Sequence, residues 1–273
     1  MFTAVFTRAL RRVLASIVLA MVVALVVVAA GCSGDSGSSD AKRTTTTTIA
    51  PETARAAYLS DVATARGPSI SVYAGPDEVE PMLVLDNPWV VDPDEPGATV
   101  PQVFLVKDQD PAAPGAEEPP DEWVEVLLPV RPNGSTGWVR RAEVTLAPNP
   151  YRIEVELAAH RITVTNADSI LYQGSVAAGA ADTPTPTGTY YLRVLLQAPD
   201  PNTVYGPFAY GLSSHSDALE TFNGGDGEIG IHGNNDASVL GQDVTHGCVR
   251  IDNTAITALA SQLPLGTPVD IVA

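Results

Sequence analysis

The chain has 273 residues, enough for one large domain or two modest ones. Its formal net charge is −17, from 15 basic and 32 acidic residues, and this balance argues against a nucleic-acid partner because such partners need a basic surface. The 23 prolines and 22 glycines indicate many turns and few long helices.

Residues 1–31 have the pattern of an export signal. An uncharged apolar run covers Val13 to Ala30, and small residues lead directly into Cys32. Three arginines precede the apolar run: Arg8, Arg11 and Arg12. The pattern resembles a bacterial lipoprotein signal, although Ala29 stands where such signals usually carry Leu. The resemblance implies lipidation of Cys32, and the alternative is that the apolar run stays as an anchor helix.

Residues 32–50 are small and polar without apolar periodicity, which is typical of a flexible tether. Residues 51–67 are expected to form a linker or a short helix. Residues 68–148 contain short alternating runs, such as Ser69–Tyr73 and Gln102–Val106, and an Asn133-Gly134 turn. Their opening SVYAGPD and closing GSTGWVRRAEV resemble a bacterial SH3-like module, which implies a small β-barrel.

Residues 151–273 are predicted to form a second, mainly β domain. Alternating apolar residues indicate strands near Ile153 and Ile162, and a further strand is expected at residues 190–196. Asp252 or Asn253 can cap one helix over residues 254–262, which Pro264 stops. A last strand is expected at residues 268–272.

The candidate catalytic residues lie in one segment, residues 229–253, IGIHGNNDASVLGQDVTHGCVRIDN. Cys248 is the second of only two cysteines, and a thiol becomes nucleophilic near a base or a positive charge. His232 and His246 are candidate bases. An extended chain would project His246, Cys248 and Arg250 to one face.

Two neighbours of Cys248 suggest how a reaction could be supported. Gly247 permits close backbone approach, so its N–H and that of Cys248 could bind an oxyanion. Arg250 has a guanidinium fork that suits a substrate carboxylate. Each residue also has an ordinary structural explanation, and a lone cysteine is usually a small buried apolar residue. Their combination favours a cysteine nucleophile.

The same segment resembles the signature of the L,D-transpeptidase (YkuD-type) catalytic domain. The similarity includes His232-Gly233-x-Asn235 and the run from Thr245 to Arg250, THGCVR. Upstream segments also fit: TPTPTGTYY, YGPFAYGLS and FNGG. The resemblance covers residues 151–273 and implies a β-sandwich with one short helix.

Residue roles follow from this resemblance. Cys248 is the expected nucleophile and His232 its base. His246 is expected beside the nucleophile, where it would orient the site or help to bind the oxyanion. The Gly233 carbonyl is expected to hold the imidazole of His232, and the N–H groups of Gly247 and Cys248 to form the oxyanion hole. The expected substrate-binding set is Arg250, Gly233, Asn235 and Thr245. Arg250 would steady either the active-site loop or a carboxylate of the stem peptide, and the sequence does not separate these two roles.

The resemblance also implies a reaction and its partners. The enzyme would form a thioester at Cys248 with one peptidoglycan stem peptide and pass it to the amine of another, giving a 3→3 cross-link. Carbapenem-type β-lactams are expected inhibitors. No cofactor or metal is expected, and His160 and His215 show no metal-ligand spacing. The expected location is the outer face of the cell membrane, facing the cell wall.

Several alternatives stay open from the sequence. Water as acceptor would make the protein an L,D-carboxypeptidase, and a protein amine as acceptor would make it an anchoring enzyme. A protein of a different class, a non-catalytic lipoprotein that binds the cell wall, would use the β modules as readers. The SH3-like module itself is either a spacer or a part that binds the wall or positions substrate.

Overall fold

The computed structural model describes residues 60–91, 97–107, 122–222 and 225–273. The predicted signal segment, Cys32 and the tether lie outside these ranges. All described residues fall in one unit, Ile49–Ala273. Within these described ranges, no helix is long and apolar enough to cross a membrane.

The described part of the chain is mainly β with a single short α-helix, α2, at Asn253–Ala260, and both features confirm the prediction. The described residues of the N-terminal half form nine strands and one 3-10 helix. They are β1 Ser60–Ala65, β2 Ser69–Val72, β3 Leu83–Asp86, β4 Trp89–Val90, β5 Thr99–Val100, β6 Val103–Leu105, β7 Trp123–Leu127, β8 Thr136–Arg140, η1 Arg141–Glu143 and β9 Val144–Asn149.

This N-terminal β module is built from several small sheets. Strands β6, β1 and β9 form one three-stranded sheet, and β2–β3, β4–β5 and β7–β8 form pairs. Isolated bridges join Tyr73 to Trp138 and Val106 to Val126. The described residues therefore show small β sheets rather than the continuous closed barrel that the SH3-like resemblance implied.

The predicted linker or short helix at residues 51–67 is wrong for residues 60–65, which form β1. This strand is the central one of its sheet, with Val62 opposite both Leu105 and Ala147. Pairing along both edges satisfies its backbone groups and outweighs any local helical preference. The remaining part of that prediction, residues 51–59, lies outside the described residues.

In the C-terminal half, the residues outside the gap at 223–224 form ten strands and a second 3-10 helix. They are β10 Tyr151–Glu156, β11 Arg161–Asn166, β12 Ser169–Ser175, β13 Ala178–Gly179, β14 Gly188–Gln197, β15 Phe208–His215, β16 Glu228–His232, η2 Ala237–Val239, β17 Asp243–Thr245, β18 Val249–Arg250 and β19 Pro268–Val272.

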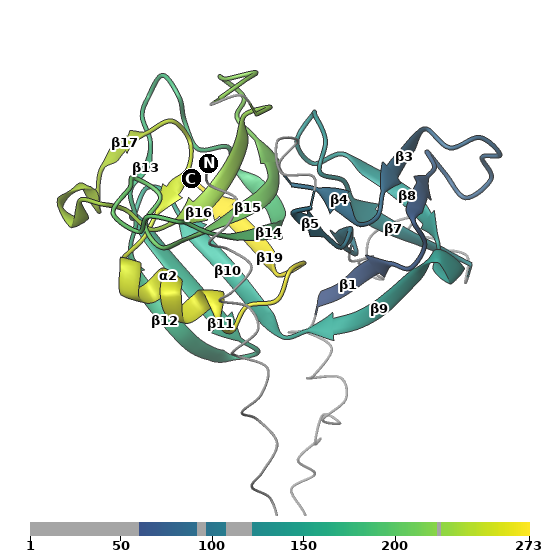
Figure 1. Cartoon of the computed structure of the whole chain (residues 1–273), viewed down its shortest axis with the longest axis horizontal. Coiled ribbons are helices and arrows are strands. Elements are labelled where there is room, and N and C mark those ends of the chain that lie inside the picture. Colours follow the sequence, from purple (N-terminus) through teal and green to yellow (C-terminus); the bar gives the residue numbers. More distant parts are fainter. Residues whose placement is uncertain (1–59, 92–96, 108–121, 223–224) are drawn as a thin grey trace, which may run out of the picture. The chain divides into compact units, whose positions relative to one another are not determined.

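Eight of these strands form one sheet in the order β12-β11-β10-β19-β14-β15-β16-β18 (Figure 1). Strand β14 joins its two halves: residues 188–191 pair with β19, whereas residues from Leu192 to Gln197 pair with β15. A strand that changes partners in this way turns a corner in the sheet. In place of the predicted sandwich, the domain has one curled eight-stranded sheet and a separate parallel pair, β13–β17.

A large apolar core fills this curled sheet. Helix α2 covers it with Ala255, Ile256 and Leu259, and Asp252 caps the helix as predicted. The buried Tyr210 hydroxyl lies 3.2 Å from the Leu259 carbonyl oxygen, at the end of the helix. The fully or nearly buried members of the core include Ile153, Val155, Ile162, Val164, Leu192, Leu212, Ile229, Ile231, Val249 and Ile251.

Candidate active site

The ends of β16 and β18 border a pocket of about 250 Å³. The two strands pair in parallel, with His232 opposite Arg250. Cys248 lies in the turn that leads from β17 into β18. The structure thereby brings together these residues singled out in the sequence: His232, Thr245, His246, Cys248 and Arg250.

The turn that carries Cys248 depends on Gly247. Its φ of +116° lies in the region that side chains rarely adopt, and a Cβ here would be 2.7 Å from Ile229 Cδ1. Glycine is therefore needed at this position for both conformation and space.

Three threonines fix the same turn from behind. The Thr183 hydroxyl donates to the Thr245 carbonyl at 3.0 Å, and the Thr185 hydroxyl donates to the Gly247 carbonyl at 2.8 Å. The Thr245 hydroxyl donates to the Cys248 carbonyl at 2.6 Å. Thr183 and Thr185 come from the TPTPTG segment, which the sequence linked to the family without suggesting this support.

The Gly247 N–H differs from its predicted role. It donates to Thr245 Oγ1 at 3.1 Å, so it is engaged in holding the turn rather than offered to an oxyanion. A hydroxyl can accept one hydrogen bond while donating another, which lets Thr245 bind both Gly247 and Cys248. Of the two predicted oxyanion donors, the Cys248 N–H takes no part in this threonine network.

The Cys248 thiol is under opposing influences. Burial raises its pKa, whereas a hydrogen bond from the Gly230 N–H and the positive charge of Arg250 lower it. The Gly230 nitrogen lies 3.4 Å from Sγ. A bulge in β15 between Gly211 and His215 interrupts the regular ladder beside Gly230. Gly230 was not singled out in the sequence.

His232 is held as a neutral base. Its ring is almost fully buried, and Nδ1 lies 2.7 Å from the Gly233 carbonyl oxygen. Because a carbonyl only accepts, Nδ1 carries the proton and Nε2 keeps the lone pair. Burial lowers the pKa of His232 to about 4, with Arg250 acting in the same direction and the Gly233 contact opposing it. The imidazole is therefore uncharged at neutral pH and able to accept a proton.

The Gly233 backbone is placed by close packing. A Cβ at Gly233 would be 2.2 Å from Asn253 Oδ1 and 3.0 Å from Gly206 Cα. Tyr205, which precedes Gly206 in the chain, lies beside the His232 imidazole, with ring centroids 5.1 Å apart. Tyr205 lines the pocket; it begins the YGPFAYGLS segment, which the sequence linked to the family without suggesting a place in the site.

His246 and Asn235 occupy different surroundings. His246 is exposed on the pocket lining, and its ring lies 5.4 Å from that of Phe222. Asn235 is exposed and borders a separate hollow, so the structure does not bring it to the cysteine. Its neighbour Asn234 is buried instead and donates to the Ile251 carbonyl at 2.7 Å.

Arg250 is the cation of the pocket. Its backbone exchanges hydrogen bonds with Ala177, which fixes the strand. Its Nε is buried without a hydrogen-bond partner, and no Asp or Glu among the described residues forms an ion pair with it. A partly buried guanidinium that lines a pocket and has no acidic partner is suited to bind an incoming carboxylate.

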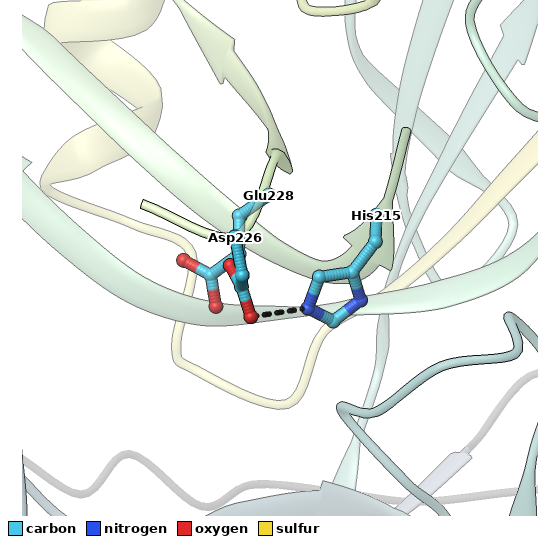
Figure 2. Close-up of side chains that lie close together, drawn as sticks. All are labelled: His215, Asp226 and Glu228. Carbon is cyan, nitrogen blue, oxygen red and sulfur yellow. Dashed lines mark hydrogen bonds and ion pairs between the residues drawn. The ribbon is translucent and has the colours of Figure 1, made fainter. Parts of the chain in front are cut away.

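One further group of side chains could hold a metal: His215, Asp226 and Glu228, whose ligand atoms lie within 4.8 Å of one another (Figure 2). Its spacing had not suggested this in the sequence. His215 Nε2 already pairs with Asp226 at 3.0 Å, and Glu228 pairs with Arg193. These pairings account for the group without an ion, and we assign it no metal.

A thiol and a neutral imidazole in one pocket on a β-sheet scaffold are the groups that a cysteine-based acyl-transfer site uses. The family model described as the L,D-transpeptidase catalytic domain, YkuD, matches residues 150–271. The C-terminal half of the chain is therefore an L,D-transpeptidase catalytic domain of this family.

Individual relatives agree with this assignment. A candidate L,D-transpeptidase, YkuD, of Bacillus licheniformis is 29% identical over 154 residues, which cover 54% of this chain and 85% of the relative. The Bacillus subtilis protein of the same description is 30% identical and covers 45% of this chain and 66% of the relative.

Among solved structures, a cysteine-to-serine mutant of an Enterococcus faecium L,D-transpeptidase is similar, with 19% identity and a TM-score of 0.35. The match covers 44% of this chain and 49% of that one, so the chain spans about half the length of this relative. The family assignment rests on the sequence matches.

Proposed function

We propose that the protein is a peptidoglycan L,D-transpeptidase that forms 3→3 cross-links through a thioester at Cys248. The observation that carries the proposal is the presence in one pocket of the Cys248 thiol and of the His232 imidazole, whose Nδ1 is fixed by the Gly233 carbonyl. Membership of the catalytic domain in the L,D-transpeptidase family supports peptidoglycan as the substrate.

In the first step, His232 Nε2 takes the proton of the Cys248 thiol as sulfur attacks the carbonyl carbon of the third stem-peptide residue. The resulting oxyanion would accept a hydrogen bond from the Cys248 N–H. When the tetrahedral intermediate collapses, the C–N bond to the terminal D-Ala breaks. Protonated His232 returns its proton to that amine, and a thioester remains.

In the second step, the neutral side-chain amine of another stem peptide attacks the thioester carbonyl. His232 accepts the proton that the amine loses, the C–S bond breaks, and the released Cys248 thiolate takes that proton from His232, which restores the resting thiol and imidazole. The product is an amide between two third residues, which is the 3→3 cross-link. A thiolate suits this step because it is a good leaving group.

Two pocket residues have proposed substrate roles. Arg250 would bind a carboxylate of the donor stem, since its guanidinium lacks an acidic partner among the described residues. The exposed His246, beside Phe222 on the pocket lining, would contact substrate rather than exchange protons with the thiol.

The proposed setting is the outer face of the cell membrane. A lipid on Cys32, or a retained apolar helix at its N-terminal side, would hold the chain there. From that position the catalytic domain would face the cell wall.

The test is to incubate the full chain, purified in detergent, with disaccharide-tetrapeptide and to analyse the products by mass spectrometry. We expect a dimer that has lost one D-Ala, and no such dimer with Cys248→Ala. A tripeptide monomer as the sole product would instead indicate an L,D-carboxypeptidase. An unchanged substrate, together with a Cys248 that a carbapenem does not acylate, would indicate a wall-binding protein without catalytic activity.

A further inference from the structure

We infer that Arg131 and Asn133, in the β7–β8 turn of the N-terminal β module, are positioning residues for the substrate pocket. The identity of the substrate rests on the proposed function, whereas the contacts described below do not depend on it. The N-terminal β module would then help to shape the substrate pocket, which a spacer would not do.

The two residues contact the pocket loop, which we define as residues 216–222 and 225–227, between β15 and β16. This loop supplies part of the pocket wall next to Cys248. The contributing residues are Ser216, Leu219, Phe222 and Gly227. The position of the loop therefore decides the shape of one side of the pocket.

Arg131 joins the two ends of the pocket loop. Its Nη1 donates to the Ser216 carbonyl at 2.7 Å, and its Nη2 donates to the carbonyls of Leu219 at 3.0 Å and Asp226 at 2.7 Å. Ser216 and Asp226 lie at opposite ends of the loop. The flat guanidinium fork has several fixed donors and can reach three carbonyls together.

Asn133 holds the strand from which the loop starts. Its Nδ2 donates to the His215 carbonyl at 2.7 Å, and its Oδ1 accepts from the His215 N–H at 2.9 Å. One side-chain amide thereby satisfies both backbone groups of the last residue of β15. A second contact of Nδ2, to Asp217 Oδ1 at 3.2 Å, reaches the loop itself.

Contacts within the catalytic domain also join the two ends of the pocket loop. The Ser216 N–H donates to the Gly227 carbonyl at 2.8 Å, and His215 pairs with Asp226 across the loop (Figure 2). Gly227 has a φ of +77°, and a Cβ there would be 2.5 Å from the Leu219 carbonyl oxygen and 3.1 Å from Arg131 Nη2. The loop is therefore packed closely against the arginine.

Removal of the guanidinium would leave three carbonyls without this donor. The pocket loop would then be held by its own contacts alone, and the wall formed by Leu219 and Phe222 would shift relative to Cys248. Small displacements of a substrate-binding wall have large effects on reaction rates. A small thiol reagent does not bind against this wall, so its rate of reaction with Cys248 should be unaffected.

The first test is hydrogen–deuterium exchange of the full chain, purified in detergent, for Arg131→Ala against Arg66→Ala. Arg66 is a matched control because it belongs to the same module and binds Thr145, away from the loop. We expect faster exchange in peptides covering the pocket loop for Arg131→Ala alone. Equal exchange in the two variants would overturn the inference, whatever the substrate is.

The second test separates positioning from general damage. For Arg131→Ala we expect KM for the donor tetrapeptide to rise about tenfold, with the alkylation rate of Cys248 by iodoacetamide unchanged. Arg131→Lys should recover only part of the loss, because one ammonium cannot replace a fork. An unchanged KM, or a parallel fall in alkylation and thermal stability, would contradict a positioning role.

The two tests also distinguish this inference from the proposed function. A wild-type protein that does not process the tetrapeptide would count against the proposed function, and the exchange experiment alone would then decide whether Arg131 holds the loop.

Discussion

At the scale of single residues, the site combines a raised thiol pKa with a lowered imidazole pKa. Burial acts on both groups in favour of the neutral form: it raises the pKa of Cys248 and lowers that of His232 to about 4. The resting pair at neutral pH is then a thiol and an imidazole rather than an ion pair. Proton transfer to His232 accompanies attack on the substrate.

This assignment predicts the pH dependence of Cys248 alkylation by iodoacetamide. The thiolate fraction increases as pH rises toward a pKa that lies above the ordinary value, so the rate should increase about tenfold per unit between pH 6 and 8. Arg250→Ala should slow alkylation throughout, because it removes a charge that lowers this pKa. A rate that is constant from pH 5 to 8 would instead indicate a standing thiolate–imidazolium pair.

A second prediction concerns the threonines behind the turn. Thr185→Val removes the donor to the Gly247 carbonyl and the acceptor for the Gly179 N–H. We expect a loss of about 1–3 kcal/mol in the free energy of unfolding and at least a tenfold lower kcat/KM. Urea unfolding and donor kinetics measure the two effects. The control is Thr189→Val. The Thr189 hydroxyl binds Asp270 at the surface, so this variant should retain kcat/KM.

The site could be predicted from the sequence where residues lie close together in the chain. His246, Cys248 and Arg250 share one short segment, and all line the pocket. The support from Thr183 and Thr185 comes from about 60 residues upstream, and only the folded chain reveals it. The engagement of the Gly247 N–H was equally hidden, since it depends on the rotamer of Thr245.

At the scale of secondary-structure elements, alternation predicted most strands of the catalytic domain but not their pairing. Strand β14 is a single apolar run in the sequence, yet it pairs with β19 in one half and with β15 in the other. Local pattern fixes which face of a strand is buried, whereas partner choice depends on distant residues. The same limit explains why β1 was not predicted to be a strand.

Helix α2 provides a prediction at this scale. Asp252 accepts hydrogen bonds from the N–H groups of Thr254 at 2.8 Å and Ala255 at 3.1 Å. Asp252→Ala should lower the free energy of unfolding by about 1 kcal/mol, because two donors lose their cap. Asp252→Asn should remain near wild type. Chemical denaturation of the three proteins measures this, and equal stabilities would show that the cap contributes nothing.

At the scale of the whole molecule, the N-terminal β module and the catalytic domain have separate cores. A third buried cluster contains Val62, Val103 and Leu105 of the module together with Tyr191 of the domain. The module is thus joined to the domain by apolar packing as well as by Arg131 and Asn133. Sequence motifs suggested its β character, but its contacts with the pocket loop required the structure.

Membrane attachment is predicted at this scale too. If Cys32 is lipidated, protein from the membrane fraction should begin at Cys32 and carry the mass of attached lipid, and Cys32→Ala should retain the signal segment. Intact-mass spectrometry of the two proteins measures this. An unprocessed wild-type chain without lipid would favour the retained anchor helix.

Intact-mass spectrometry of the full chain during reaction with disaccharide-tetrapeptide tests for a thioester at Cys248. We expect a transient adduct with the mass of the donor less D-Ala. Peptide mapping should place it on Cys248, and hydroxylamine should release it because thioesters react with that amine. Release of D-Ala by a Cys248→Ala protein would show that Cys248 is not the nucleophile, and a donor left intact by the wild-type protein would show that the protein is not an L,D-transpeptidase.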